Sequence, residues 1–193
     1  DEGLAVHAVF FDFDNDSDLD FYLLNNSLRS VGGYDLIKDQ RNTPDPLGGN
    51  KLYRNDGGKF TDVSSEAGIF RSNIGFGLGV AVGDLNLDGS QDMFVSNDFF
   101  ERDYLYLNQF NPIMENNKTQ PSKSINELNR TTPYFLEALE QCIRETSMGS
   151  MGADIADLNN DGLPDIFVTE MLPEDDRRIK TKTKFEHWDL YQQ

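Results

Sequence analysis

The sequence has very few of the side chains that bind soft metal ions. It contains one cysteine and two histidines among 193 residues. A single cysteine excludes an internal disulfide bond, and no cysteine or histidine spacing typical of zinc or iron–sulfur sites is present. We expect Cys142 to be a small, buried or half-buried apolar residue, because that is the usual environment of a free cysteine.

Basic residues and long apolar runs are also scarce. Lysine and arginine number 17 against 34 acidic residues, which gives a formal net charge of −17 at pH 7. This charge argues against binding to nucleic acid or to an anionic membrane surface, since both require a positively charged footprint. No run approaches the ~18 apolar residues of a membrane helix, and no signal peptide is visible. The hydrophobic content of 37% is still enough for a globular core.

Against this background, the chain carries one nine-residue acidic loop three times. The copies occupy residues 12–20, 84–92 and 157–165, so that their starts are 72 and 73 residues apart. Each copy lies between two short apolar stretches rich in Val, Phe and Ile, a pattern that favours strands over helices. The sequence therefore predicts a repeat protein whose unit contains a strand, an acidic turn and a second strand.

Further apolar segments recur after the loops. Leu52-Tyr-Arg-Asn55 is echoed by Leu105-Tyr-Leu-Asn108, and Gly58-Lys-Phe60 by Pro133-Tyr-Phe135. These segments predict two more strands in each unit, and therefore four strands per unit. The first two units also carry predicted insertions at 27–49 and 111–132, which are rich in turn-forming or polar residues.

The expected domain organisation is three consecutive units, over residues 1–72, 73–145 and 146–193. The third unit is incomplete, because no Leu-Tyr-x-Asn segment follows its loop. It ends instead in a charged and aromatic tail over residues 171–193. We therefore expect an all-β fold with two complete four-stranded antiparallel sheets, part of a third, and a continuation in a longer polypeptide.

The loops have the composition of calcium sites. Calcium is a hard cation that prefers six to eight oxygen ligands in a tolerant geometry. Side chains at positions 1, 3, 5 and 9 and the carbonyl at position 7 would supply them. The candidate ligands are Asp12, Asp14, Asp16, Asp18 and Asp20 in the first loop, Asp84, Asn86, Asp88, Ser90 and Asp92 in the second, and Asp157, Asn159, Asp161, Leu163 and Asp165 in the third, with Asp18, Ser90 and Leu163 contributing carbonyls.

Position 6 distinguishes the first loop from the other two. Gly89 and Gly162 occupy this position, where a sharp reversal of the chain favours a positive φ. The first loop has Ser17, which is strained if φ is positive, although its fourth carboxylate should raise the affinity for a cation. An EF-hand is excluded for all three loops, because position 12 holds Leu or Val within a strand-like run rather than Glu at the start of a helix.

The Asp-x-Asp/Asn-x-Asp-Gly-x-x-Asp loops, with the glycine-rich segments 75–79 and 147–152 before two of them, resemble FG-GAP or VCBS repeats. Such repeats are the blades of integrin-α-type β-propellers. The segments 52–63 and 152–167 are further similar to the bacterial relatives of cartilage acidic protein, a group of Bacteroidetes-type exported proteins. The resemblance implies a propeller of about seven blades, of which this chain would supply fewer than three. It also implies a structural role for up to three Ca²⁺ ions.

Three functional hypotheses follow from these observations. The leading one is a calcium-stabilised, non-enzymatic segment of an exported or cell-surface protein, for example of a bacterial outer membrane, that binds protein or glycan ligands. Extracellular calcium modules have dissociation constants of roughly 10⁻⁴–10⁻³ M, matched to the calcium level outside cells.

The second hypothesis is a propeller-type carbohydrate-active enzyme, a hydrolase or lyase, which would need paired carboxylates. Asp98, Glu101, Asp103 and Glu170 are the acidic candidates outside the loops, and we expect them to be solvated turn residues. The third hypothesis is an accessory subunit of an outer-membrane assembly. In that case Phe185, Trp188 and Tyr191 of the tail would anchor a partner.

Overall fold

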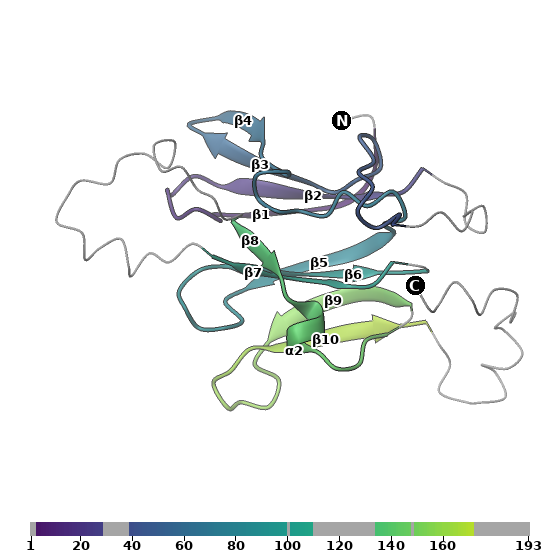
Figure 1. Ribbon diagram of the computed structural model, residues 1–193. Coiled ribbons are helices and arrows are strands. Elements are labelled where there is room, and N and C mark those ends of the chain that lie inside the picture. The colour runs from purple at the N-terminus through teal and green to yellow at the C-terminus, as the bar shows by residue number, and fades with distance from the viewer. Residues whose placement is uncertain (1–2, 29–38, 100, 110–133, 148, 172–193) are drawn as a thin grey trace, which may run out of the picture.

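The computed structural model describes residues 3–28, 39–99, 101–109, 134–147 and 149–171. These residues form three antiparallel β-sheets that are stacked in layers (Figure 1). Two sheets have four strands, the third has two, and none closes on itself. The predicted all-β class and its four-stranded antiparallel sheets are therefore confirmed.

The first sheet has its strands in the order β1-β2-β3-β4. Their bounds are β1 (Leu4–Phe11), β2 (Asp20–Asn26), β3 (Lys51–Asp56) and β4 (Lys59–Asp62). In β2, Tyr22 and Leu24 are fully buried whereas Phe21 and Leu23 are half-buried. Successive side chains of a strand point to opposite faces, so the two faces of this sheet have different environments.

The second sheet repeats the first, with the order β5-β6-β7-β8. Its strands are β5 (Gly77–Gly83), β6 (Asp92–Asn97), β7 (Tyr104–Asn108) and β8 (Phe135–Glu137). Met93 lies opposite Tyr106 as Phe21 lies opposite Tyr53 in the first sheet. The registers of the two sheets therefore correspond residue by residue.

The third sheet pairs β9 (Ser150–Ala156) with β10 (Asp165–Glu170). Among the described residues, no third or fourth strand joins it. The predicted tail at 171–193, apart from Met171, and the predicted insertion at 111–132 lie outside the described residues. The insertion at 27–49 is described in part, and Asp45 there donates its N–H to the carbonyl of Arg71 at 2.7 Å.

Two hydrophobic clusters hold the layers together. The larger lies between the first two sheets and includes Phe13, Leu24, Met93 and Tyr106, each fully buried. The smaller lies between the second and third sheets around Phe94, Leu105 and Leu139, which are 2–4% exposed. Strand β5 lies against β1, β2 and β9 and so occupies the centre of the stack.

Close approach of the layers explains glycine in β5. A Cβ atom on Gly79 would lie 3.0 Å from the backbone of Ala153 in β9, and one on Gly77 would lie 2.3 Å from the side chain of Leu24 in β2. Any larger residue would push the sheets apart. The glycine-rich segment before the second loop is therefore a packing requirement.

One short helix was not predicted from the sequence. Helix α2 (Leu139–Cys142) follows β8, and Leu139 is its only buried residue. Cys142 ends this single turn and is exposed, so the expected burial of this cysteine was wrong. No helix in the described part of the chain has the length and apolarity needed to cross a membrane.

Candidate metal centre

The three acidic segments form the turns of three β-hairpins, and we call them loop 1 (residues 12–20), loop 2 (84–92) and loop 3 (157–165). They connect β1 to β2, β5 to β6 and β9 to β10. The hairpin turns lie on the same side of the stack, at the left in Figure 1. Each loop begins directly after a strand, and its ninth residue is the first residue of the next strand.

The first residue of each loop holds the turn in shape. The two oxygens of Asp12 accept the N–H groups of Asp16 at 3.1 Å and Ser17 at 2.9 Å. Asp84 and Asp157 make the same pair of bonds to positions 5 and 6 of their loops, at 2.9–3.1 Å. A carboxylate at position 1 therefore closes all three turns in the same way.

The ninth residue ties each loop to its sheet. Asp20 accepts the N–H of Phe13 at 3.0 Å and that of Asn55 in β3 at 2.8 Å. Asp92 likewise accepts the N–H groups of Leu85 at 2.9 Å and Asn108 in β7 at 2.7 Å. In loop 3, position 9 accepts the N–H of position 2 at 3.0 Å.

The backbone reverses at two positions in every loop. Position 6 has φ values of 74° at Ser17, 89° at Gly89 and 86° at Gly162, as its glycines predicted. Position 4 is also left-handed, with φ of 56–60°, although it holds Asn15, Leu87 or Asn160. The sequence could have indicated this left-handed conformation only at Asn15 and Asn160, because asparagine tolerates it better than leucine does.

Loop 1 gathers carboxylates most closely. One oxygen from each of Asp12, Asp14 and Asp20 lies within 4.8 Å of the others. Asp14 is 2% exposed, and its Oδ1 atom has no hydrogen-bond partner. Burial, followed by repulsion from the carboxylates of Asp20, Asp16 and Asp12, raises the pKa of Asp14 to about 7. Burial also raises the pKa of Asp20 to about 6.

A divalent cation fits this arrangement. Converging carboxylates in a poorly solvated place repel one another, and a bound cation would remove that repulsion and satisfy the unpartnered oxygen of Asp14. The donors are all oxygens, which suits a hard cation such as Ca²⁺. Asp16 and Asp18 are not part of the close group. The carboxylate of Asp18 accepts the N–H of Gly57 at 2.8 Å.

Loops 2 and 3 are more open. Position 3 holds Asn86 and Asn159, which are exposed and donate from Nδ2 to Asp88 and Asp161 at 3.0 Å. Among the described residues, neither loop forms a group of three carboxylates as close as that of loop 1. Burial, which outweighs the hydrogen bonds that the carboxylate accepts, still raises the pKa of Asp92 to about 6.

Loops 1 and 3 also differ in how far the next sheet covers them. Phe13, at position 2 of loop 1, is fully buried against Tyr134 and Phe135, with ring centroids 5.2 and 6.0 Å apart. Asn108 Nδ2 donates to the carbonyl of Phe13 at 2.8 Å, so β7 of the second sheet also holds this loop. Leu158, at the same position of loop 3, is 61% exposed.

Three of the four acidic residues at the opposite ends of the strands are buried, so our expectation that they are solvated was wrong for those three. Asp98, Glu101 and Asp103 are 2–7% exposed, and only Glu170 is exposed. Asp103 accepts hydrogen bonds from the N–H of Asn97 and from Ser150 Oγ, both at 2.8 Å. Burial is the main cause of its raised pKa.

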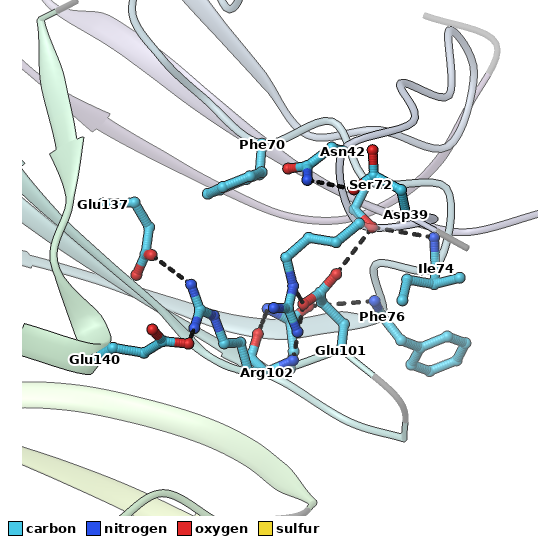
Figure 2. A network of polar contacts seen from close by, with 12 residues as sticks. Asp39, Asn42, Phe70, Ser72, Ile74, Phe76, Glu101, Arg102, Glu137 and Glu140 are labelled. Carbon is cyan, nitrogen blue, oxygen red and sulfur yellow. Dashed lines mark hydrogen bonds and ion pairs between the residues drawn. The ribbon is translucent and has the colours of Figure 1, made fainter. Parts of the chain in front are cut away.

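Glu101 is the centre of a polar network that joins distant segments (Figure 2). Its carboxylate pairs with Arg41 at 2.6 Å and accepts a hydrogen bond from Ser72 Oγ at 2.9 Å. The neighbouring Arg102 pairs with Glu137 at 2.8 Å and with Glu140. The carboxylates of Glu101, Glu137 and Glu140 therefore hold together segments that are distant in the sequence.

Comparison with known proteins adds no assignment. No protein-family model matches the chain, and no curated protein matches it. The functional interpretation therefore depends on the geometry of the loops and on the way the sheets pack.

Proposed function

We propose that this chain is a calcium-stabilised run of FG-GAP or VCBS-type β-propeller blades with a non-enzymatic role in binding, adhesion or scaffolding. The observation that carries the proposal is the carboxylate group of loop 1, with its buried, unpartnered Asp14 oxygen. Loops 2 and 3 share its backbone path and hydrogen bonds. Each would hold a further ion with lower affinity, because fewer charged side chains converge there.

The packing of the sheets supports the blade interpretation. Each four-stranded sheet runs antiparallel in sequence order, and the segment after its last strand leads to the first strand of the next sheet. Successive sheets pack face to face through apolar side chains. A propeller repeats this arrangement around an axis, and further sheets of the same kind would complete it.

Two considerations favour an exported protein without catalytic activity. Calcium sites on extracellular modules are filled at about millimolar calcium and would be empty at the level of the cytosol. Within the described residues, the buried acids outside the loops already accept hydrogen bonds or pair with arginine. A paired acid and base for polysaccharide cleavage would have to come from elsewhere. Ligands would be proteins or glycans at the cell surface.

The test is calcium titration of the chain by calorimetry, together with thermal unfolding in calcium, in magnesium and in chelator. Asp12→Asn removes a charge from position 1, and Asp154→Asn removes one from an exposed site in β9 as the matched control. For the wild type, calcium at ten times the dissociation constant should stabilise the fold by about 1.4 kcal/mol per site. The loop variant should lose one site and its share of this stabilisation.

The control variant should bind calcium as the wild type does. Absence of binding and of stabilisation at millimolar calcium would refute the metal proposal. Equal stabilisation by magnesium would refute the identity of the ion, because magnesium requires a stricter octahedral geometry than these loops offer.

A further inference from the structure

Strand β3 brings a positive charge to loop 1. Arg54 lies two residues after Leu52, and side chains two apart in a strand point to the same face of a sheet. Leu52 is fully buried in the cluster between the first two sheets, so Arg54 also faces the second sheet. The next residue, Asn55, donates its N–H to Asp20 of loop 1 at 2.8 Å. The Arg54 side chain is 14% exposed, and its guanidinium is therefore largely shielded from water.

The charge of Arg54 acts on Asp14, whose Oδ1 atom has no hydrogen-bond partner. Burial and then the neighbouring carboxylates raise the pKa of Asp14, and Arg54 opposes them by stabilising the ionised form. The Nε and Nη2 atoms of Arg54 donate instead to the two oxygens of Asp56, both at 3.1 Å. Asp56 therefore holds the guanidinium while an oxygen of Asp14 stays unpartnered.

The second unit has neither of these two charges. Strand register aligns Arg54 with Leu107, and position 3 of loop 2 holds Asn86 where loop 1 has Asp14. Leu107 packs in the cluster between the second and third sheets, so this strand position faces the following sheet in both units. The first unit thus has a further carboxylate in its loop and a cation on the facing strand. The two charges complement each other.

Arg54 should oppose the binding of a divalent cation to loop 1. The ligands would be Asp12, Asp14 and Asp20, and a guanidinium that acts on Asp14 repels any cation bound there. Without a bound cation, the same guanidinium offsets the repulsion among the three carboxylates. Both effects are smaller while Asp56 neutralises Arg54.

We propose that Arg54 is a built-in competitor of the cation at loop 1, and that Asp56 limits this competition by holding the guanidinium. The inference rests on the proposed function, since loop 1 must bind calcium for Arg54 to compete with it. Arg54 is not a ligand of the ion. It sets the affinity of loop 1 and stabilises the loop when calcium is scarce.

Calcium titration followed by nuclear magnetic resonance tests the proposal one loop at a time. The amide signals of position 6 report the dissociation constant of each loop in a single sample, at Ser17, Gly89 and Gly162. Arg54→Gln should lower the dissociation constant of loop 1 at least about fivefold and leave that of loop 2 unchanged. Arg144→Gln is the control for net charge, because Arg144 is exposed and lies outside the three hairpins. It should bind calcium as the wild type does.

A double-mutant cycle separates the holding of Arg54 from the charge of Asp56 itself. The Asp56 side chain is 47% exposed, so Asp56→Asn should fold even if Arg54→Gln does not. It should raise the dissociation constant of loop 1 at least about fivefold, because Arg54 is released toward Asp14. In the Arg54→Gln background the same change should have an effect below about twofold, since exposed charges are screened. An equal effect in both backgrounds would overturn the proposal.

The remaining outcomes distinguish this inference from the proposed function. Unchanged binding at loop 1 in Arg54→Gln, or an equal change at all three loops, would overturn the inference alone. A wild-type loop 1 that binds no calcium would overturn the proposed metal site as well. In chelator, Arg54→Gln should unfold at a lower urea concentration than the wild type, and saturating calcium should narrow this difference. A difference of the same size with and without calcium would also overturn the inference.

Discussion

Truncation of Phe13 would measure how much the contact between loop 1 and the second sheet contributes to stability. Its ring is fully buried and contacts the rings of Tyr134 and Phe135. Truncation of a buried phenylalanine to alanine costs about 3–5 kcal/mol, because apolar area is exposed and a cavity remains. We therefore expect Phe13→Ala to lower the free energy of unfolding by about this amount. Leu158→Ala should change it by less than about 0.5 kcal/mol, since Leu158 is exposed.

Urea denaturation of both variants and the wild type, at a protein concentration where the chain is monomeric, measures these values. Chelator should be present, so that a changed metal affinity does not contribute to the difference. Equal losses of unfolding free energy for the two variants would refute the reasoning. Position 2 of the loop would then contribute the same stability with and without a covering sheet. A loss for Phe13→Ala below about 1 kcal/mol would refute it as well.

Two further predictions follow from the loops. Asn108→Ala should lower the free energy of unfolding, measured in urea, by about 1–3 kcal/mol, because the carbonyls of Phe13 and Gln91 lose their donor. An unchanged free energy of unfolding would contradict a role of Asn108 in holding the two sheets together. In chelator, stability should fall as pH rises from about 4 to about 7. The pKa of Asp14 is raised to about 7 and those of Asp20 and Asp92 to about 6, so their contribution is present at acid pH and lost as they ionise. Calcium should abolish this fall, and urea midpoints across the range would check both statements.

The hairpins could be predicted because their signals are local. An apolar run, an acidic turn and a second apolar run follow one another directly in the sequence, and two of the three turns have glycine at position 6. In each of the three copies the two runs form paired strands. The equivalence of Leu52-Tyr-Arg-Asn55 with Leu105-Tyr-Leu-Asn108 likewise located β3 and β7. Pattern and turn chemistry are sufficient for such elements, since no distant contact decides them.

The contacts between sheets could not be predicted in the same way. Position 2 of each loop is apolar, but nothing in the sequence links Phe13 to Tyr134, which approaches it only when two sheets stack. Glu101 is buried for a similar reason, because its partners Arg41 and Ser72 come from a different unit. A charged residue near a turn is usually solvated, and here tertiary pairing overrides that tendency.

Sheet packing and metal binding act on the same carboxylates in loop 1. The second sheet covers Phe13, and Asp14 and Asp20 of the same loop are buried, which raises the free energy of their ionised forms. A cation bound to Asp12, Asp14 and Asp20 lowers that free energy again, so it should favour the packed arrangement over one in which the sheets separate. By linkage, an intact contact between the sheets should in turn order the ligands for the ion. Loop 3 lacks this covering among the described residues, and Asn159 at its position 3 replaces the carboxylate that Asp14 supplies in loop 1.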